Sequence, residues 1–148
     1  MMERTITGGG RVKLIADVCL VAADRVLLVK YGEGAGHDGQ SGWFLPDDLL
    51  ADFEPPEEAA LRCLFAQTGV EATAPFLSHI ESFRGRDGSW HLAFHYVVQL
   101  AKAPALKPGP GVVETAWFDL VKLPPKADVA HHGWALTTIK EILQRASG

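Results

Sequence analysis

Residues 45–70 read LPDDLLADFEPPEEAALRCLFAQTGV and contain the clearest helix signal in the chain. The proline pair at 55–56 suits a first helical turn, and the two glutamates that follow complement the positive end of the helix dipole. Apolar residues then recur at helical spacing, namely Ala60, Leu61, Leu64 and Phe65. Gly69 stands where a left-handed C-terminal cap is needed. We therefore predict a helix from about Pro55 to Gln67, with Leu64 buried.

Strand-like segments lie on both sides of this helix. Composition and alternation predict strands over residues 11–20, 26–29, 76–83, 92–100 and 112–118. The polar turns at 22–25 and 85–88 indicate two hairpins. Residues 43–45 suit a short strand or bend that Pro46 stops, and a second amphipathic helix begins near His131. This order predicts an α/β fold in which helices flank a mixed β-sheet.

The composition is that of an ordinary globular protein. The 148 residues suit a single domain over 1–148, and 14 basic against 18 acidic residues give a net charge of −4, which argues against a nucleic-acid-binding protein. Cys19 and Cys63 have neither zinc spacing nor a CxxC pattern. No apolar run approaches the ~20 residues of a membrane helix, and residues 1–7 lack a signal peptide's apolar stretch. We expect a cytoplasmic protein without membrane contact.

The acidic residues are unevenly distributed. Residues 31–61 contain eight acids and no lysine or arginine, and they include a glycine-rich loop over 31–42. A solvated acidic loop is the simpler interpretation. The functional interpretation is a divalent-cation site, because hard cations such as Mg²⁺ select carboxylate oxygens.

Residues 45–70 also resemble the signature of the Nudix (MutT-like) hydrolases. Aligned without a gap, Glu54 matches the first glutamate of that signature, Arg62 its arginine and Gly69 its closing glycine. Residues 114–118, followed by Leu-Pro at 123–124, resemble the family's last strand, so the likeness covers most of the chain. The resemblance implies a Nudix-type α/β/α sandwich.

The chain departs from the signature at the metal-binding positions. Cys63, Ala66 and Gln67 stand where the family has three glutamates, and acids at 47–48 replace its glycine pair. In the family those glutamates hold Mg²⁺ or Mn²⁺ on a pyrophosphate. A thiol is too soft for Mg²⁺, alanine has no ligand atom, and the glutamine offers one neutral oxygen. Losing metal stabilisation worth several kcal/mol would slow turnover by roughly 10³ or more.

The resemblance suggests several candidate site residues. The candidates are Glu54 and Arg62 for catalysis, Phe44 and Trp90 for substrate binding, and Asp47, Gln67 and Glu114 as weak metal ligands. Structural roles compete with these functional ones. Arg62 can pair with Glu58 one helical turn earlier, and Glu54 can cap the helix. Aromatic residues beside strands are more often in the core, which we favour for Trp43.

The histidines of the predicted strands do not suggest a metal site. His91 and His95 lie four residues apart, which is ~13 Å along a strand and too far for a shared ion. His79 is isolated in its strand.

The resemblance implies a protein that binds a nucleoside-diphosphate-linked small molecule, with much reduced or lost Mg²⁺-dependent pyrophosphohydrolase activity. Mg²⁺ or Mn²⁺ would bind weakly or not at all. One alternative is an active, divergent Nudix hydrolase that recruits Asp47, Asp48, Glu54, Glu58 or Glu114. Another is a protein-interaction module on the same fold. The residues do not set an oligomeric state.

Overall fold

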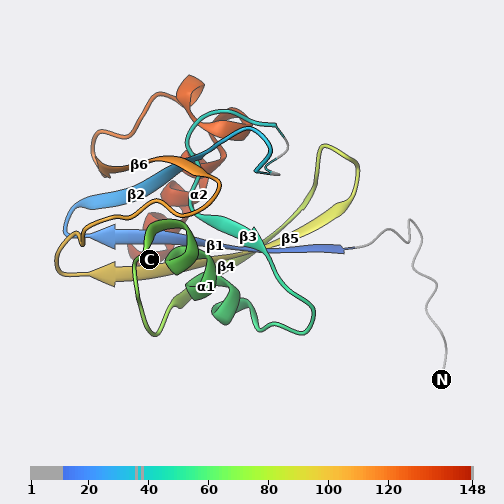
Figure 1. Ribbon diagram of the computed structural model, residues 1–148, viewed down its shortest axis with the longest axis horizontal. Helices are drawn as coiled ribbons and strands as arrows, with labels where there is room; N and C mark the ends of the chain where they lie inside the picture. The colour runs from blue at the N-terminus through green and yellow to red at the C-terminus, as the bar shows by residue number, and fades with distance from the viewer. Residues whose placement is uncertain (1–11, 36, 38, 148) are drawn as a thin grey trace.

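A mixed β-sheet runs through the computed structural model, which describes residues 12–35, 37 and 39–147 (Figure 1). The elements are β1 (Val12–Ala22), β2 (Arg25–Tyr31), β3 (Asp47–Leu49), α1 (Pro56–Thr68), β4 (Phe76–Arg84), β5 (Trp90–Leu100), β6 (Val112–Asp119), a 3-10 helix (Lys126–Asp128) and α2 (Ala130–Ser147). Among the described residues the sheet has six strands in the order β4-β5-β1-β2-β6, and β3 pairs with β1. Arg11, residues 1–7, Gly36 and Asp38, on which parts of the sequence predictions fall, lie outside the described residues.

The central strand of the sheet is β1. It pairs in parallel with β5 along all of its 11 residues, and antiparallel with β2 and β3. The hairpins β1–β2 and β4–β5 predicted from the turns are therefore present. In this register Asp17 of β1 has His95 of β5 on one side and Asp47 of β3 on the other.

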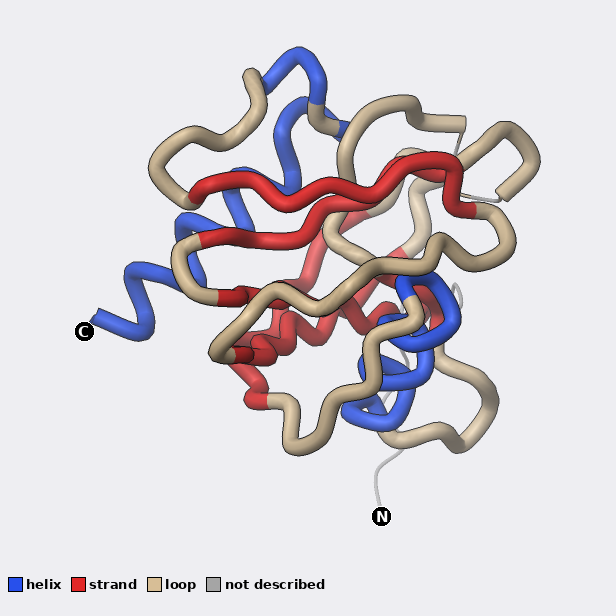
Figure 2. Tube along the Cα trace, turned by 60° about the vertical axis from the view of Figure 1, so that its left-hand side comes forward, coloured by secondary structure: helices blue, strands red, loops and turns tan. Residues whose placement is uncertain are grey.

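The two helices cover opposite faces of the sheet. Alternate residues of β1 separate the two cores, because Val18 and Leu20 pack under α1 while Cys19 packs under α2. Figure 1 shows α1 in front of the strands and α2 behind them, and Figure 2 shows the same two layers from the side. The predicted α/β/α sandwich is confirmed.

Helix α1 follows the signals in its sequence. It begins at Pro56 and ends where Gly69 adopts a φ of 75°, and the Gly69 N–H donates to the carbonyl of Phe65. Leu64 is fully buried, as predicted, in the core between α1 and the sheet. The helix therefore has the position that the Nudix-like signature requires.

The segment after Trp43 differs from the prediction that Pro46 ends a strand. Trp43 and Phe44 form only isolated bridges, and regular pairing begins after the proline, in β3. Proline removes one N–H donor, but its carbonyl still accepts a 3.0 Å hydrogen bond from the Val18 N–H. A short strand therefore begins directly after Pro46 instead of ending there. Trp43 is buried against Phe118, which agrees with a core role.

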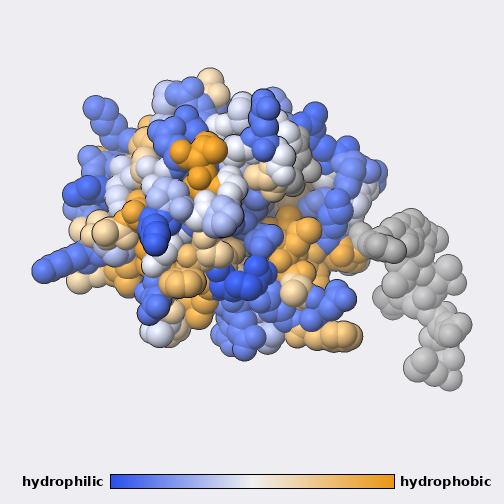
Figure 3. All heavy atoms as spheres, viewed as in Figure 1, coloured by the Kyte–Doolittle hydropathy of each residue, from blue (hydrophilic) through white to orange (hydrophobic). Residues whose placement is uncertain are grey.

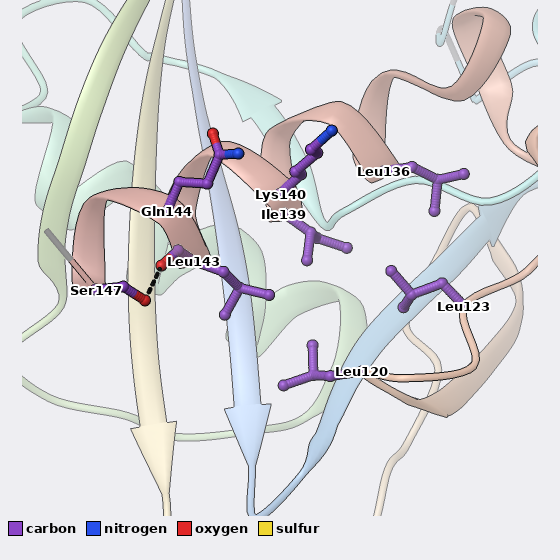
Figure 4. A pocket seen from close by; sticks show the side chains of 8 residues that line it. All are labelled: Leu120, Leu123, Leu136, Ile139, Lys140, Leu143, Gln144 and Ser147. Carbon is purple, nitrogen blue, oxygen red and sulfur yellow. Dashed lines mark hydrogen bonds between the residues drawn. The ribbon is translucent and has the colours of Figure 1, made fainter.

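Helix α2 begins with a left-handed turn. His131, His132 and Gly133 have φ values of 53°, 56° and 89° before the regular helix continues. Further along, the helix places Leu136, Ile139 and Leu143 beside Leu120 and Leu123, which follow β6 (Figure 4). The two histidines are thereby held at one end of the helix, outside its apolar contact with the sheet.

The face of the molecule seen in Figure 3 is mostly hydrophilic, with local apolar areas. Figure 3 shows apolar side chains at the start of β1, where Val12 and Leu14 are each 37% exposed. Within the described part of the chain, neither helix has the length and hydropathy that crossing a membrane requires.

The loop between β5 and β6 holds the C-terminal end of α1. The Gly109 N–H donates to the Gln67 carbonyl at 2.9 Å, and the Lys107 N–H donates to the Thr68 carbonyl at 2.8 Å. A Cβ atom on Gly109 would lie 1.7 Å from the carbonyl oxygen of Ala66. The close approach of the loop to the helix therefore depends on glycine at this position.

Replacing Gly109 with alanine should lower the free energy of unfolding by at least about 3 kcal/mol, because two backbone segments would have to separate. Gly88→Ala is the matched control. Gly88 has a φ of 82° and no neighbouring atom within 4 Å, so only about 1–2 kcal/mol of backbone strain is expected. Urea denaturation of both variants measures the difference, and equal losses would contradict the close contact.

Candidate functional site

The face of α1 that would carry the family's metal ligands is closed by hydrogen bonds. Cys63 is buried, its thiol donates to the Ala60 carbonyl at 3.3 Å, and burial raises its pKa well above the usual value. Ala66 is exposed and has no ligand atom. The Gln67 Nε2 donates to the Asp47 carbonyl at 2.8 Å, and its Oε1 accepts from the Tyr31 hydroxyl at 2.7 Å. The one side-chain oxygen on this face already has a partner.

Asp47 lies beside this face, where it is paired with His37. The His37 Nε2 is 2.9 Å from Asp47 Oδ1, and the imidazole stacks on Tyr31 with ring centroids 3.5 Å apart. Desolvation lowers the pKa of His37, but the hydrogen bond and charge of Asp47 outweigh it and raise that pKa. Its other ring nitrogen faces the Ala35 carbonyl at 3.3 Å. Both ring nitrogens therefore face acceptors, which favours the protonated imidazole.

These donors do not fit Mg²⁺ or Mn²⁺. Such ions need several hard oxygens, whereas this face offers a buried thiol, a methyl group and an amide oxygen that already accepts a hydrogen bond. The described residues also contain no group of three or more His, Cys, Asp or Glu side chains arranged to hold a metal ion.

Arg62 binds two of the remaining acids. Its guanidinium donates to both carboxylate oxygens of Glu54, at 2.8 and 2.9 Å, and to Asp48 at 2.8 Å. It also donates to the Leu49 carbonyl at 3.1 Å, and its hydrogen bonds hold the pKa of Glu54 down at about 2. Arg62 thus connects α1 to β3 and to the loop before the helix.

The structural roles that the sequence suggested for Arg62 and Glu54 are wrong. Arg62 pairs with Glu54 and Asp48 instead of Glu58, because the planar guanidinium reaches two carboxylates at once. Glu54 does not cap the helix, since Pro55 occupies the N-cap without a side-chain hydrogen bond. Glu54 instead accepts from the Ala51 N–H at 2.9 Å.

The other predicted site residues do not all come together. Phe44 is buried with its ring edge against Tyr31, 5.1 Å between centroids, and it lines the cavity described next. Trp90 is 48% exposed, donates to Ser82 and lies outside that cavity's lining. Glu114 on β6 lies 3.5 Å from Lys30 and is also outside it.

A cavity of about 810 Å³ opens between β1, β3, the β4–β5 hairpin and the start of α2. Its lining combines cationic, acidic and aromatic side chains, including Lys13, Arg84, Arg86, Asp47, Asp48, Glu81, Phe44, Phe83, His91, His131 and Trp134. This volume and mixture suit a small polar molecule with a flat ring.

Asp17, His95 and Glu81 form a hydrogen-bonded chain of charged side chains, called the relay below, and its Glu81 end lines this cavity. His95 is fully buried, its Nδ1 lies 2.8 Å from both carboxylate oxygens of Asp17, and its Nε2 lies 2.9 Å from Glu81 Oε1. The Trp134 Nε1 donates to the same Glu81 oxygen at 3.2 Å. The His79 ring lies 4.7 Å from that of His95.

The two carboxylates keep His95 charged. Desolvation lowers the pKa of His95, but the bonds to Asp17 and Glu81 outweigh it and raise that pKa to about 9. Burial raises the pKa of Asp17, which the bond from His95 opposes. Because each ring nitrogen faces a carboxylate, the imidazolium between two carboxylates is the form that satisfies all three groups.

Sequence reasoning missed this relay. The signal for it was Asp17 itself, an acid between apolar residues in a buried strand, which requires a partner. His37 and Trp134 carried no comparable signal, because their partners lie on segments distant in the sequence.

The chain is similar in sequence pattern and in fold to known proteins. The family model described as NUDIX domain matches residues 12–137. A NUDIX hydrolase from Nitrosomonas europaea has a TM-score of 0.72 at 19% identity, over 90% of both chains. A MutT NUDIX hydrolase from Burkholderia pseudomallei has a TM-score of 0.73 at 19% identity, over 89% of this chain and 98% of that one. No curated protein matches significantly.

Some of the similar structures contain a ligand, and one of these aligns with nearly the whole chain. This structure is the NUDIX domain of Shewanella oneidensis NrtR complexed with ADP ribose, with a TM-score of 0.75 at 20% identity. The alignment covers 97% of this chain and 94% of that one. At this identity the similarity shows a common fold.

The relay should make stability depend on pH. The folded protein holds the His95 proton to about pH 9, whereas the unfolded chain releases it near pH 6.5. The stabilisation is therefore complete below about pH 6.5 and lost as the pH rises through about 9, for a decrease on the order of 3 kcal/mol.

Urea denaturation from pH 6 to 10 measures this loss, and His95→Gln should abolish that part of it. His132→Gln is the control, because His132 is exposed at the start of α2. NMR titration of the wild-type imidazole gives the pKa of His95 directly. A value near 6.5 would contradict the buried imidazolium.

Proposed function

The chain belongs to the NUDIX family, and we propose that it binds a nucleotide-like small molecule while its metal-dependent pyrophosphohydrolase activity is much reduced or lost. The observation that carries this proposal is Gln67. At a position where the family signature has a metal-binding glutamate, its amide is held between Tyr31 and Asp47 by hydrogen bonds at both ends. A cation would have to break this network to gain one neutral oxygen ligand.

The acids near the helix support the loss of metal binding. Arg62 is ion-paired with both Asp48 and Glu54, and His37 is paired with Asp47. The active-hydrolase alternative recruits carboxylates from a set that includes these three acids, with Glu58 and Glu114 as the others. Recruiting any of the three would break ion pairs in addition to desolvating the metal, so the geometry favours binding without metal.

The cavity supports the binding part of the proposal. Arg84 and Arg86 supply positive charge for phosphates, and Phe83 and Trp134 supply ring surfaces for a base. Lys13 lines the same cavity and is paired with Asp87 at 2.6 Å. The NUDIX domain crystallised with ADP ribose makes that compound the first ligand to test.

Calorimetric titration with Mg²⁺, Mn²⁺ and ADP-ribose, separately and combined, tests both parts. We expect ADP-ribose to bind with the same affinity in the presence and absence of metal, because no carboxylate cage is available to bridge its phosphates. A dissociation constant for Mg²⁺ or Mn²⁺ below about 1 μM would instead support the active hydrolase. Absence of any nucleotide binding would instead favour the alternative that the chain is a protein-interaction module.

Restoring the three glutamates tests the cause of the loss. The combined change Cys63→Glu, Ala66→Glu and Gln67→Glu should create a metal site and raise hydrolysis of ADP-ribose. It should also lower stability without metal, because clustered carboxylates repel and the amide donor to Asp47 is lost. Added Mn²⁺ should recover that stability by linkage.

The single change Cys63→Glu is the control for this restoration, since one carboxylate cannot hold the ion. Hydrolysis rates and melting temperatures with and without Mn²⁺ measure both effects. A triple variant that folds and binds Mn²⁺ but hydrolyses no nucleoside-diphosphate compound would contradict a nucleotide-binding cleft.

A further inference from the structure

Glu81 presents a fixed hydrogen-bond acceptor to the cavity. Its Oε1 accepts from both the His95 Nε2 and the Trp134 Nε1. Its Oε2 has no hydrogen-bond partner among the described residues, although the side chain is only 38% exposed and lines the cavity. One oxygen of this carboxylate is therefore held in place while the other remains available to a ligand.

The relay keeps this acceptor ionised and oriented. Asp17, His95 and Glu81 come from the adjacent strands β1, β5 and β4, so the sheet sets their relative positions. The hydrogen bond from His95 lowers the pKa of Glu81 despite partial burial. A carboxylate held by two donors does not need to reorganise when a ligand arrives, which favours selective recognition.

Aromatic rings surround the same part of the cavity. Phe83 lies two residues from Glu81 on β4, and its ring stacks on that of His91 with 5.1 Å between centroids. The Phe83 ring also contacts Trp134 edge-on at 5.7 Å. All three rings line the cavity, so a planar group bound there would contact ring surface and carboxylate together.

The charges nearby select between two kinds of planar ligand. A carboxylate among aromatic rings can bind an organic cation or the N–H edge of a neutral base. Arg84 and Arg86 line the same cavity and form no ion pair with any described residue, so they would repel a cation. They would attract the phosphates of a nucleotide, which favours the neutral base.

We infer that Glu81 determines the specificity of the cleft by accepting a hydrogen bond from the amino or ring N–H edge of a purine base whose phosphates face Arg84 and Arg86. This inference rests on the proposed nucleotide binding and adds the class of base. A purine without such a donor would leave the Oε2 atom of Glu81 desolvated and without a hydrogen-bond partner. Sites built to bind a donor reject analogues that lack it for this reason.

The test compares three nucleoside diphosphates by calorimetry: ADP, GDP and purine riboside 5′-diphosphate, whose base has no N–H donor on its six-membered ring. The wild-type protein should bind ADP or GDP at least about tenfold more tightly than the purine riboside compound. This comparison needs no variant, so a folding defect cannot obscure it. Equal affinities for all three would overturn the inference and leave nucleotide binding intact.

Glu81→Gln changes the acceptor with little change of shape. The amide oxygen would replace Oε1 as acceptor for His95 and Trp134, leaving an NH₂ donor to face the cavity. The preference for ADP or GDP should then fall to less than about twofold. Glu71→Gln, an exposed carboxamide substitution outside the cavity lining, should retain it.

A preference that survives in Glu81→Gln would assign the selectivity to another group and overturn the inference. If the wild-type protein binds none of the three compounds, the proposed nucleotide binding fails, and the inference fails with it. The two failures are distinguished by whether wild-type binding is observed.

Discussion

The parallel pairing of β1 with β5 is the constraint on which the rest of the structure depends. It joins segments whose facing residues, Asp17 and His95, are 78 positions apart in the chain. The pairing places β1 at the centre of the sheet, where its alternate residues face α1 and α2. It also buries Asp17, which is stable there because His95 supplies a charged donor from the next strand. The cavity wall that contains Glu81 follows from this register.

The acids on the α1 side of the cleft are paired with basic side chains of the protein itself. Clustered acids normally need a cation, and the NUDIX family is one whose hydrolases generally use a divalent metal. In this chain the neutralising cations are side chains, because His37 pairs with Asp47, and Arg62 pairs with Asp48 and Glu54. Gln67 completes the arrangement as a neutral bridge between β2 and β3. The helix and its arginine match the family signature, while these ion pairs lower the uncompensated negative charge on this side of the cleft.

The two sides of the cleft therefore differ in chemical character. Near α1, the acidic groups have their partners within the protein. Near β4, the basic side chains Arg84 and Arg86 have no ion-pair partner among the described residues, and Glu81 has one oxygen available. Polar groups without internal partners at a cavity wall are the groups that a ligand can satisfy. The asymmetry favours recognition of a ligand at the β4 side over metal-assisted chemistry at the α1 side.

The sequence by itself determined the elements whose signals are local. Helical spacing, the proline pair and Gly69 defined α1, and alternation with polar turns defined both hairpins. The gapless match of Glu54 and Arg62 to a signature identified the family, since a motif of fixed spacing needs no tertiary information. The replacement of three glutamates was likewise readable from residue types alone.

Only the tertiary structure decided which charged groups meet. Arg62 reaches Asp48 and Glu54 across a loop, where helical spacing had suggested Glu58. His95, which sequence spacing had only excluded from a metal site, became the centre of a relay through strands distant in the chain. The physical reason is that hydrogen-bond partners depend on strand register and loop path, which long-range packing sets. Local propensity determines elements, and packing determines the partners of their side chains.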